Sequence, residues 1–489
     1  METTGQKLTK YRLGDIATIE VSTVDKKSVE GERSVRLCNF VDVYYNWAIT
    51  KNMYSNLLVA TAKDKQIEKF QLRKGQVAIT KDSETRDDIG IATYIADDFD
   101  DVVLGYHCAL ITPNENIVDG SYLNAFIHSS YIQKYFENNA TGSGMRYTLS
   151  TDTMNNLPIL LPSLEKQREI GMLFSNLDRK IEQNKLINHN LEALAKQLYD
   201  YWFVQFDFPD ENGKPYKSSG GKMAWNEKLK RDIPSSWAVK TIDDVVEVYN
   251  GATPSTADEE NYGGDVVWIT PKDLSNQQQK FIYQGERNIS NKGYESCSTH
   301  LLPSNTVLMS SRAPIGLLAI AKTELCTNQG FKSFIPKNDN EATYLYYYIQ
   351  AHIKQIEQLG TGTTFKEVSR EDVLKFPILK PNDELLDTWE ERISAINDKQ
   401  LEIQKENENL TKQRDELLPL LMNNQVSLNY DLSVVALLGG HIRPVVGYRP
   451  LLVCSREEGV SPVGSCSGRC NQSRTVEKRL RVFVLGLGH

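Results

Sequence analysis

The chain has 489 residues, which is too long for one hydrophobic core, so two or three domains are expected. Hydrophobic residues make up 40% and charged residues 25%, as in ordinary globular proteins. No apolar run approaches the roughly 20 residues that cross a bilayer, and no signal pattern opens the chain, so a cytoplasmic protein without a membrane partner is predicted. The net charge of −8 disfavours a solitary nucleic-acid binder, unless basic residues gather on one surface or partners supply them.

The first part of the chain, residues 1–162, has the pattern of a domain of mixed strands and helices. Short β-rich runs alternate with turn residues, and the clearest runs lie at residues 35–37, 76–79, 90–95 and 109–111. A helix is predicted at residues 121–137, because aromatic and aliphatic residues recur there at helical spacing.

A long helix is predicted at residues 163–205. The residues of its main row recur at alternating steps of four and three: Ile170, Phe174, Leu177, Ile181, Asn184, Asn188, Leu191, Ala195, Leu198 and Trp202. Heptad spacing that continues over more than four heptads indicates a coiled-coil seam.

A second half repeats this order after residues 206–236, which are rich in Pro, Gly, Lys and Asp and are predicted to be a linker with turns. A second domain is predicted over residues 237–381, with strands at 266–269, 306–309 and 317–320 and a helix at 342–358. A second long helix, residues 382–424, carries its own row: Trp389, Ile393, Ile396, Gln400, Ile403, Asn407, Leu410, Arg414, Leu417 and Leu421.

The two halves keep a constant offset. Adding 219 to each position of the first row gives the second row, and the same offset relates Ser150 to Ser369 and Pro158 to Pro377. The sequence therefore predicts an α+β protein of two tandem domains of mixed β-sheet and helices, separated by two long antiparallel coiled-coil helices.

One polar position is shared by the two rows, because Asn188 corresponds to Asn407. A polar residue in a coiled-coil seam can fix the register of the helices, since a buried amide needs a partner. We expect Asn188 to meet Asn407 where the helices cross a pseudo-twofold axis. The alternative is that both amides lie at the wet edge of the seam.

No pattern in the chain predicts a catalytic site, a metal site or a cofactor. The phosphate-binding loop motif is absent, the seven histidines lack zincin spacing, and the seven cysteines show no ligand spacing. His107 lies beside Cys108, but neighbours in a strand face opposite sides, so a solvent or core histidine is the better interpretation than half of a nucleophile pair.

The composition changes at the C-terminal end. From Asp431 the chain carries eight basic and four acidic residues, no sustained period and three of the seven cysteines. Residues 425–489 are predicted to be disordered or foreign to the fold, and a basic arm on DNA is the alternative.

The residues from Leu8 to about Ser427 resemble the specificity subunits of type I restriction-modification systems. Each domain ends in a G-[ST]-G element and a proline-bounded strand before a long helix, at residues 142–144 and 360–362. Trp237 followed by residues 250–255 (Asn-Gly-Ala-Thr-Pro-Ser) is similar to the family's domain entry, and so is the passage over residues 198–217 to its linker. The first domain departs from this pattern, because residues 20–22 replace the G-x-T-P-S loop.

The resemblance implies a non-catalytic subunit with two target-recognition domains that read a bipartite, interrupted sequence in double-stranded DNA. It also implies two DNA methyltransferase (M) subunits and restriction/translocase (R) subunits as partners. The open alternative is a coiled-coil adaptor that joins two protein partners without reading DNA.

Side chains that contact bases and phosphates are expected on loops of both domains, because base edges and phosphates are met by Arg, Lys and small hydroxyl residues. For each candidate the alternative is a solvated loop side chain. The candidates are Lys81, Ser83, Arg86, Arg146, Tyr147, Thr253, Ser255, Lys272, Ser311, Arg312, Thr364 and Lys366.

Overall fold

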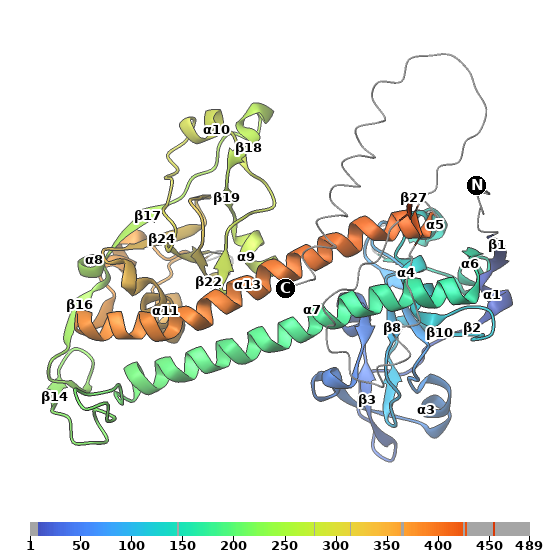
Figure 1. Ribbon diagram of the computed structural model, residues 1–489, viewed down its shortest axis with the longest axis horizontal. Helices are drawn as coiled ribbons and strands as arrows, with labels where there is room; N and C mark the ends of the chain where they lie inside the picture. The colour runs from blue at the N-terminus through green and yellow to red at the C-terminus, as the bar shows by residue number, and fades with distance from the viewer. Residues whose placement is uncertain are drawn as a thin grey trace. The chain divides into compact units, whose positions relative to one another are not determined.

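The computed structural model describes residues 8–143, 146–277, 279–312, 314–362, 366–423, 426–427 and 453–454. Two compact units share the chain: unit 1 takes Met1–Gln183 and Glu408–His489, and unit 2 takes Asn184–Asn407. The predicted α+β class with two long antiparallel helices is confirmed (Figure 1). Each long helix is divided between the units, and the domain boundaries drawn from the sequence stay predictions.

Unit 1 contains a five-stranded sheet and a three-stranded sheet. The first has the order β2 (Ala17–Val21), β10 (Cys108–Pro113), β6 (Val77–Thr80), β8 (Ala92–Ile95) and β4 (Ala48–Ile49). All neighbours are antiparallel except β4, which is parallel to β8. The second has the order β5 (Leu58–Ala62), β3 (Arg33–Cys38) and β9 (Val102–Leu104).

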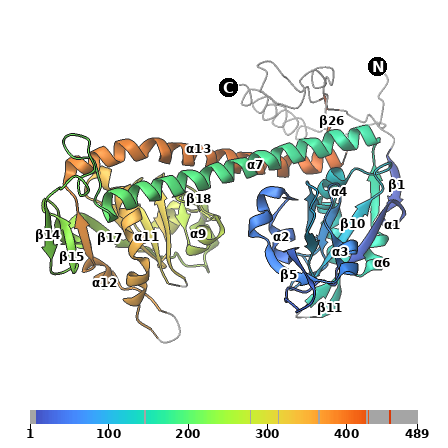
Figure 2. The same ribbon diagram turned by 90° about the horizontal axis from the view of Figure 1, so that it is seen from below.

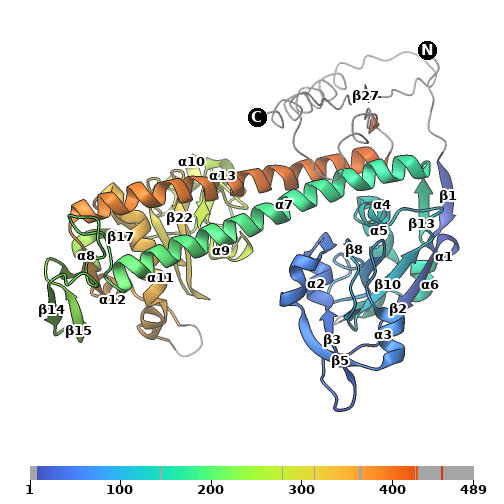
Figure 3. The same cartoon turned by 60° about the horizontal axis from the view of Figure 1, so that its bottom comes forward.

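The helices α4 (Gly120–Ile127) and α5 (Ser130–Asn139) of unit 1 lie between its five-stranded sheet and the long helix α7 (Leu164–Tyr199) (Figure 3). Their apolar residues share one core with Phe174 of α7 and Leu417 of the second long helix, α13 (Asp383–Met422). The single helix predicted over residues 121–137 is therefore two helices. They are separate because Ser129 has an extended backbone at the start of α5.

Unit 2 repeats the sheet of unit 1. The order is β17 (Val246–Asn250), β24 (Phe331–Pro336), β21 (Val307–Ser311), β22 (Ile315–Ala321) and β20 (Phe281–Ile282). The outer strand β20 is again the parallel one. Beside each sheet a strand from the domain entry pairs with the proline-bounded strand, β1 (Thr9–Arg12) with β13 (Pro158–Leu161) and β16 (Ala238–Thr241) with β25 (Pro377–Lys380). The repeat in the sequence is thus a repeat of the fold.

The remaining elements of the two domains are short, apart from α11 (Ala342–Gln358), the helix predicted at residues 342–358. In unit 1 the short helices are α1 (Leu13–Ile16), α2 (Phe40–Tyr45), η1 (Lys51–Asn56), α3 (Asp64–Phe70) and α6 (Thr151–Asn155). In unit 2 the short elements include α8 (Ile242–Val245), α9 (Pro271–Gln277), α10 (Asn291–Glu295), α12 (Arg370–Leu374), β18 (Tyr262–Val266), β19 (Trp268–Ile269) and β23 (Cys326–Thr327).

The predicted linker, residues 206–236, is part of unit 2 and contributes to its core. It contains the hairpin of β14 (Met223–Asn226) and β15 (Arg231–Pro234) (Figure 2). Phe206 and Phe208 are buried in the core of the unit, where both rings lie about 5 Å from the ring of Trp237. A turn-rich composition did not predict this packing, because a few aromatic residues suffice to anchor the segment.

The long helices are antiparallel within unit 2, because residues of increasing number along α7 contact residues of decreasing number along α13. Asn184 donates to Asn407, Gln400 donates to Glu192, and the rings of Trp202 and Trp389 lie 5.7 Å apart. Near its end α7 changes into a π-helical turn over Asp200–Val204, which carries Trp202 into the core.

The expected contact between Asn188 and Asn407 does not form. Asn407 accepts a hydrogen bond from Asn184 at 2.9 Å, whereas the side-chain amide of Asn188 donates to Gln279 at 2.9 Å. Heptad spacing identifies the face of each helix, but it does not determine which turn faces which. The prediction was wrong by one helical turn.

A buried lysine joins the helices of unit 2. The side chain of Lys280 is 4% exposed, and its Nζ donates to Tyr347 at 2.7 Å on α11 and to Asn397 at 2.8 Å on α13. Glu192 of α7 lies 3.5 Å from the same atom. Burial lowers the pKa of Lys280 to about 8, although Glu192 acts in the opposite direction. One ammonium group thus bonds to α11 and α13 and faces a carboxylate of α7.

The largest fully buried side chain, Trp389, lies at the centre of an aromatic cluster in unit 2. Its ring centroid lies 5.1 to 6.4 Å from those of Tyr199, Trp202, Phe203 and Tyr347. Trp389→Ala should lower the free energy of unfolding by about 3–5 kcal/mol, because it removes buried area and leaves a cavity. Urea titration of the purified chain measures this change.

Trp225→Ala is the matched control, because Trp225 is 55% exposed. We expect its free energy of unfolding to stay within about 0.5 kcal/mol of the wild-type value. Equal effects of the two substitutions would contradict the aromatic cluster as a source of stability.

Candidate nucleic-acid interface

A small sheet brings together candidate residues of the first domain that are far apart in the sequence. It consists of β11 (Thr141–Ser143), β12 (Arg146–Thr148) and β7 (Asp82–Ser83). Gly142 permits the close approach of β11 to β12, because its φ is +136° and a Cβ there would lie 2.1 Å from the carbonyl oxygen of Arg146. Figure 2 shows β11 at the end of unit 1 that is remote from α7.

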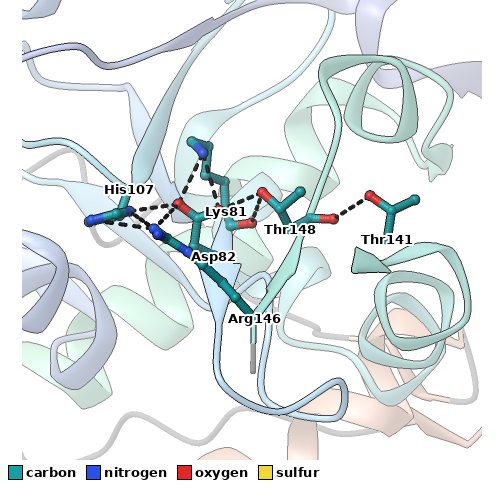
Figure 4. Close-up of polar contacts among 6 residues, drawn as sticks. All are labelled: Lys81, Asp82, His107, Thr141, Arg146 and Thr148. Carbon is teal, nitrogen blue, oxygen red and sulfur yellow. Dashed lines mark hydrogen bonds and ion pairs between the residues drawn. The ribbon is translucent and has the colours of Figure 1, made fainter. Parts of the chain in front are cut away.

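Asp82 is the centre of this site (Figure 4). It accepts a hydrogen bond from Thr148, and its Oδ2 lies 2.7 Å from His107 Nδ1, 3.0 Å from Lys81 Nζ and 3.0 Å from Arg146 Nη2. Burial raises the pKa of Asp82, but hydrogen bonds from Thr148, His107 and Lys81 outweigh it and lower the pKa to about 2. The carboxylate is therefore ionised at neutral pH and holds the groups around it in place.

Basic and aromatic side chains surround this carboxylate. The guanidinium of Arg86 lies 5.1 Å from the ring of Tyr147, and Lys81 Nζ lies 5.7 Å from the ring of Tyr106. The side chain of Arg146 is 55% exposed although it pairs with Asp82. Such a group can form further hydrogen bonds with a phosphate or a base.

The same backbone arrangement recurs in unit 2 with different side chains. Glu367 pairs with Thr361 on one side and with Arg312 on the other, as Thr148 pairs with Thr141 and Asp82 in unit 1. The backbone amide of Ser311 donates to Gly330, as that of Lys81 donates to His107. This correspondence places Arg312 where unit 1 has Asp82.

The carboxylate therefore lies on different segments in the two units. Unit 1 has the small three-stranded sheet, and unit 2 has two single β-bridges in its place, which are called its small sheet below. In unit 1 the carboxylate is Asp82 and its neighbour on the facing strand is Thr148. In unit 2 the carboxylate is Glu367, which lies 3.3 Å from Lys332 Nζ, and the facing residue is Arg312. Within the part of the chain that the structure describes, no acidic side chain forms an ion pair with Arg312. The scaffold is shared, and its polar surface is not.

The other candidates from the sequence occupy varied environments. Thr253 and Ser255 are exposed, and Thr253 donates to Gln329. Lys272 is exposed and pairs with Glu286 at 2.9 Å.

Three further candidates lie on or beside the segments of the small sheets. Ser83 is half-buried in β7, where its hydroxyl accepts from the backbone amide of Thr85. Lys366 is exposed. Ser311 is fully buried beside Lys332, so it is left out of the contacts proposed below. Thr364 lies outside the described residues, as does nearly all of the tail over residues 425–489.

Sequence reasoning missed the members of the site that are acidic or come from another loop. Asp82 lies between the candidates Lys81 and Ser83 in the sequence but is not of a residue type expected to contact bases or phosphates, and the position of His107 beside Cys108 favoured a solvent or core histidine. Asp82 and His107 are 25 residues apart, and Asp82 and Arg146 are 64 apart. A one-dimensional pattern does not show such a cluster.

Over the described ranges, no group of three or more His, Cys, Asp or Glu side chains could hold a metal ion. None of the helices in these ranges is long and apolar enough to cross a membrane.

The fold defines a protein of two tandem-duplicated α+β domains, and comparison with known proteins gives its family. The family described as the type I restriction modification DNA specificity domain matches the chain twice, over residues 6–193 and 234–412. The chain belongs to this family. The prediction of a non-catalytic recognition subunit is confirmed by this membership.

Individual relatives agree with the family. The chain is 26% identical over 429 residues to the type I restriction enzyme HindI specificity subunit of Haemophilus influenzae. This alignment covers 77% of this chain and 92% of that subunit. It is 42% identical over 169 residues to the type I restriction enzyme MjaIX specificity subunit of Methanocaldococcus jannaschii, which covers 33% of this chain but only 39% of that subunit.

A solved structure has the same fold. The crystal structure of a type I restriction-modification system S subunit from M. genitalium aligns with a TM-score of 0.54 at 14% identity, covering 86% of this chain and 97% of that chain.

The low pKa of Asp82 predicts a pH-dependent contribution to stability. Its folded pKa of about 2 lies below the ordinary value of 3.8, so the contribution is present above pH 3.8 and is lost as the pH falls toward 2. Asp82→Asn should lower the free energy of unfolding by about 1–2 kcal/mol at pH 7, and the difference from wild type should shrink below pH 4.

Urea titrations at several pH values between 7 and 3 measure this difference. Asp87→Asn is the matched control, since Asp87 is an exposed carboxyl in the same loop and should show no such trend. A cost of Asp82→Asn that does not change with pH would contradict the ionised cluster.

Proposed function

We propose that this chain sets the sequence specificity of a type I restriction-modification complex, and that each domain binds one half of an interrupted double-stranded DNA target. The observation that supports this most strongly is the exchange of Asp82 for Arg312 at one position of a shared scaffold. Two domains of the same fold that carry different polar groups can bind two different half-sites. An adaptor for two copies of one partner would keep its two surfaces alike.

The proposed DNA contacts are polar side chains from both domains. Exposed or partly exposed lysine and arginine groups can neutralise phosphates, and arginine is the usual partner of guanine in the major groove. The set comprises Lys81, Ser83, Arg86, Arg146, Tyr147, Thr253, Ser255, Lys272, Arg312, Thr364 and Lys366.

Protein partners complete the proposed function, because the chain itself belongs to a family of recognition subunits. We infer that two methyltransferase subunits and restriction/translocase subunits bind this chain in the cytoplasm. Exposed apolar side chains on the unit 2 portion of α7 support a protein partner, since Leu186, Ile187 and Leu194 are 53%, 45% and 51% exposed. Neutralisation of phosphates by these partners would also offset the acidic composition of this chain.

Arg312→Ala tests the proposed readout by the second domain. If the guanidinium contacts guanine with two hydrogen bonds, the substitution should cost about 1–3 kcal/mol of binding and relax specificity at one base pair of one half-site. Competition binding with the full chain and its methyltransferase subunits, at one fixed salt concentration, measures both effects.

Lys399→Ala is the matched control, because Lys399 is an exposed cation on α13 that pairs with Glu402, and neither residue is among the proposed contacts. We expect it to leave specificity unchanged. Unchanged specificity in Arg312→Ala would remove Arg312 from the contacts. A complex that assembles but shows no sequence preference would favour the adaptor instead.

A further inference from the structure

His107 has a backbone conformation that side chains disfavour. Its φ is +75°, in the turn between β9 and β10. A residue with a Cβ pays roughly 1–2 kcal/mol to adopt this region, so the surrounding structure must compensate for it. Strain of this kind occurs often at functional sites.

The fold does not require this conformation. Gly330 occupies the corresponding place in unit 2, because Ser311 donates to its carbonyl as Lys81 donates to that of His107. Gly330 could adopt a positive φ without cost, yet its φ is not positive. The strain in unit 1 is therefore specific to His107 and not a property of the shared frame.

Two contacts orient the imidazole ring of His107, one with Asp82 (Figure 4) and one with the ring of Tyr106. Its Nδ1 lies 2.7 Å from Asp82 Oδ2, and because a carboxylate only accepts, Nδ1 is the donor. The ring centroid lies 4.2 Å from that of Tyr106. Arg146 Nη2 lies against the same Nδ1, and since two donors cannot bond to each other, both groups are directed at Asp82 Oδ2. The side chain is nevertheless 35% exposed, so the ring is held in one orientation while part of it faces solvent.

We propose that His107 is a specificity-determining residue of the first domain and contacts a base edge in the first half-site, which rests on the proposed function above. A phosphate can be bound equally well by a long, flexible lysine, so a ring of fixed orientation offers no advantage there. A base edge is recognised by hydrogen bonds of defined direction, which a ring of fixed orientation can provide. Asp82 acts as the positioning residue for this ring. Unit 2 has no counterpart, because Gly330 carries no side chain, so the two domains read with different sets of groups.

The test is His107→Gly in the full chain, bound to its methyltransferase subunits. Glycine accepts the positive φ, so the substitution removes the ring without a backbone penalty. We expect discrimination against a substitution at one base pair of the first half-site to fall about 5- to 150-fold, while discrimination in the second half-site stays unchanged. Circular dichroism and thermal melting verify that the variant is folded.

His107→Asn is the second variant, because asparagine tolerates this backbone region and can still donate to Asp82. It should keep the fold and lose the same discrimination, since it lacks the ring. Full discrimination in both variants would overturn the proposal. An equal loss of affinity for all sequences would also overturn it, because that result indicates a phosphate contact.

These outcomes are distinguishable from a failure of the proposed function. If the wild-type complex prefers one interrupted sequence and His107→Gly retains it fully, only the role of His107 is wrong. If the wild-type complex shows no sequence preference, the proposed function itself fails.

Discussion

The pairing of α7 with α13 is the interaction on which the rest of the structure depends. Each unit takes one part of both helices, so neither core closes without the partner helix. In unit 2 the two helices are held together by the packing of Trp389 against four aromatic rings. Lys280 adds a second link, because its Nζ donates to Asn397 of α13 and lies 3.5 Å from Glu192 of α7. In unit 1 the same role falls to apolar residues such as Phe174 and Leu417. A constant offset of 219 relates the two rows of seam positions, so both helices carry the same spacing.

The two units share the backbone arrangement that stabilises them, and they differ in the polar side chains on the small sheets. The order of the five-stranded sheets and the pairing of the small sheets are repeated, and so are the backbone hydrogen bonds beside them. The polar residues that the frame carries are not repeated: Asp82, Thr148 and His107 stand where the second domain has Arg312, Glu367 and Gly330. A chain can thus change what each domain contacts while its core stays intact.

The sequence predicted the parts of this structure that depend on periodicity. Heptad spacing gave the seams of α7 and α13, and the constant offset gave the repeat. It did not give the axial register, because Asn188 and Asn184 lie on the same seam one turn apart. The packing of Phe206 and Phe208, the charged cluster at Asp82 and the backbone of His107 depend on contacts between distant positions. No local pattern encodes such contacts.

The central claim is that two domains on one frame read two different half-sites, and methylation mapping tests it most directly. The full chain would be produced with its methyltransferase subunits in cells that lack other modification systems, and every methylated adenine would be located. The account predicts methylation within one interrupted sequence that has two unlike halves at a fixed separation. Methylation at a single uninterrupted sequence, or none above background in an assembled complex, would contradict it.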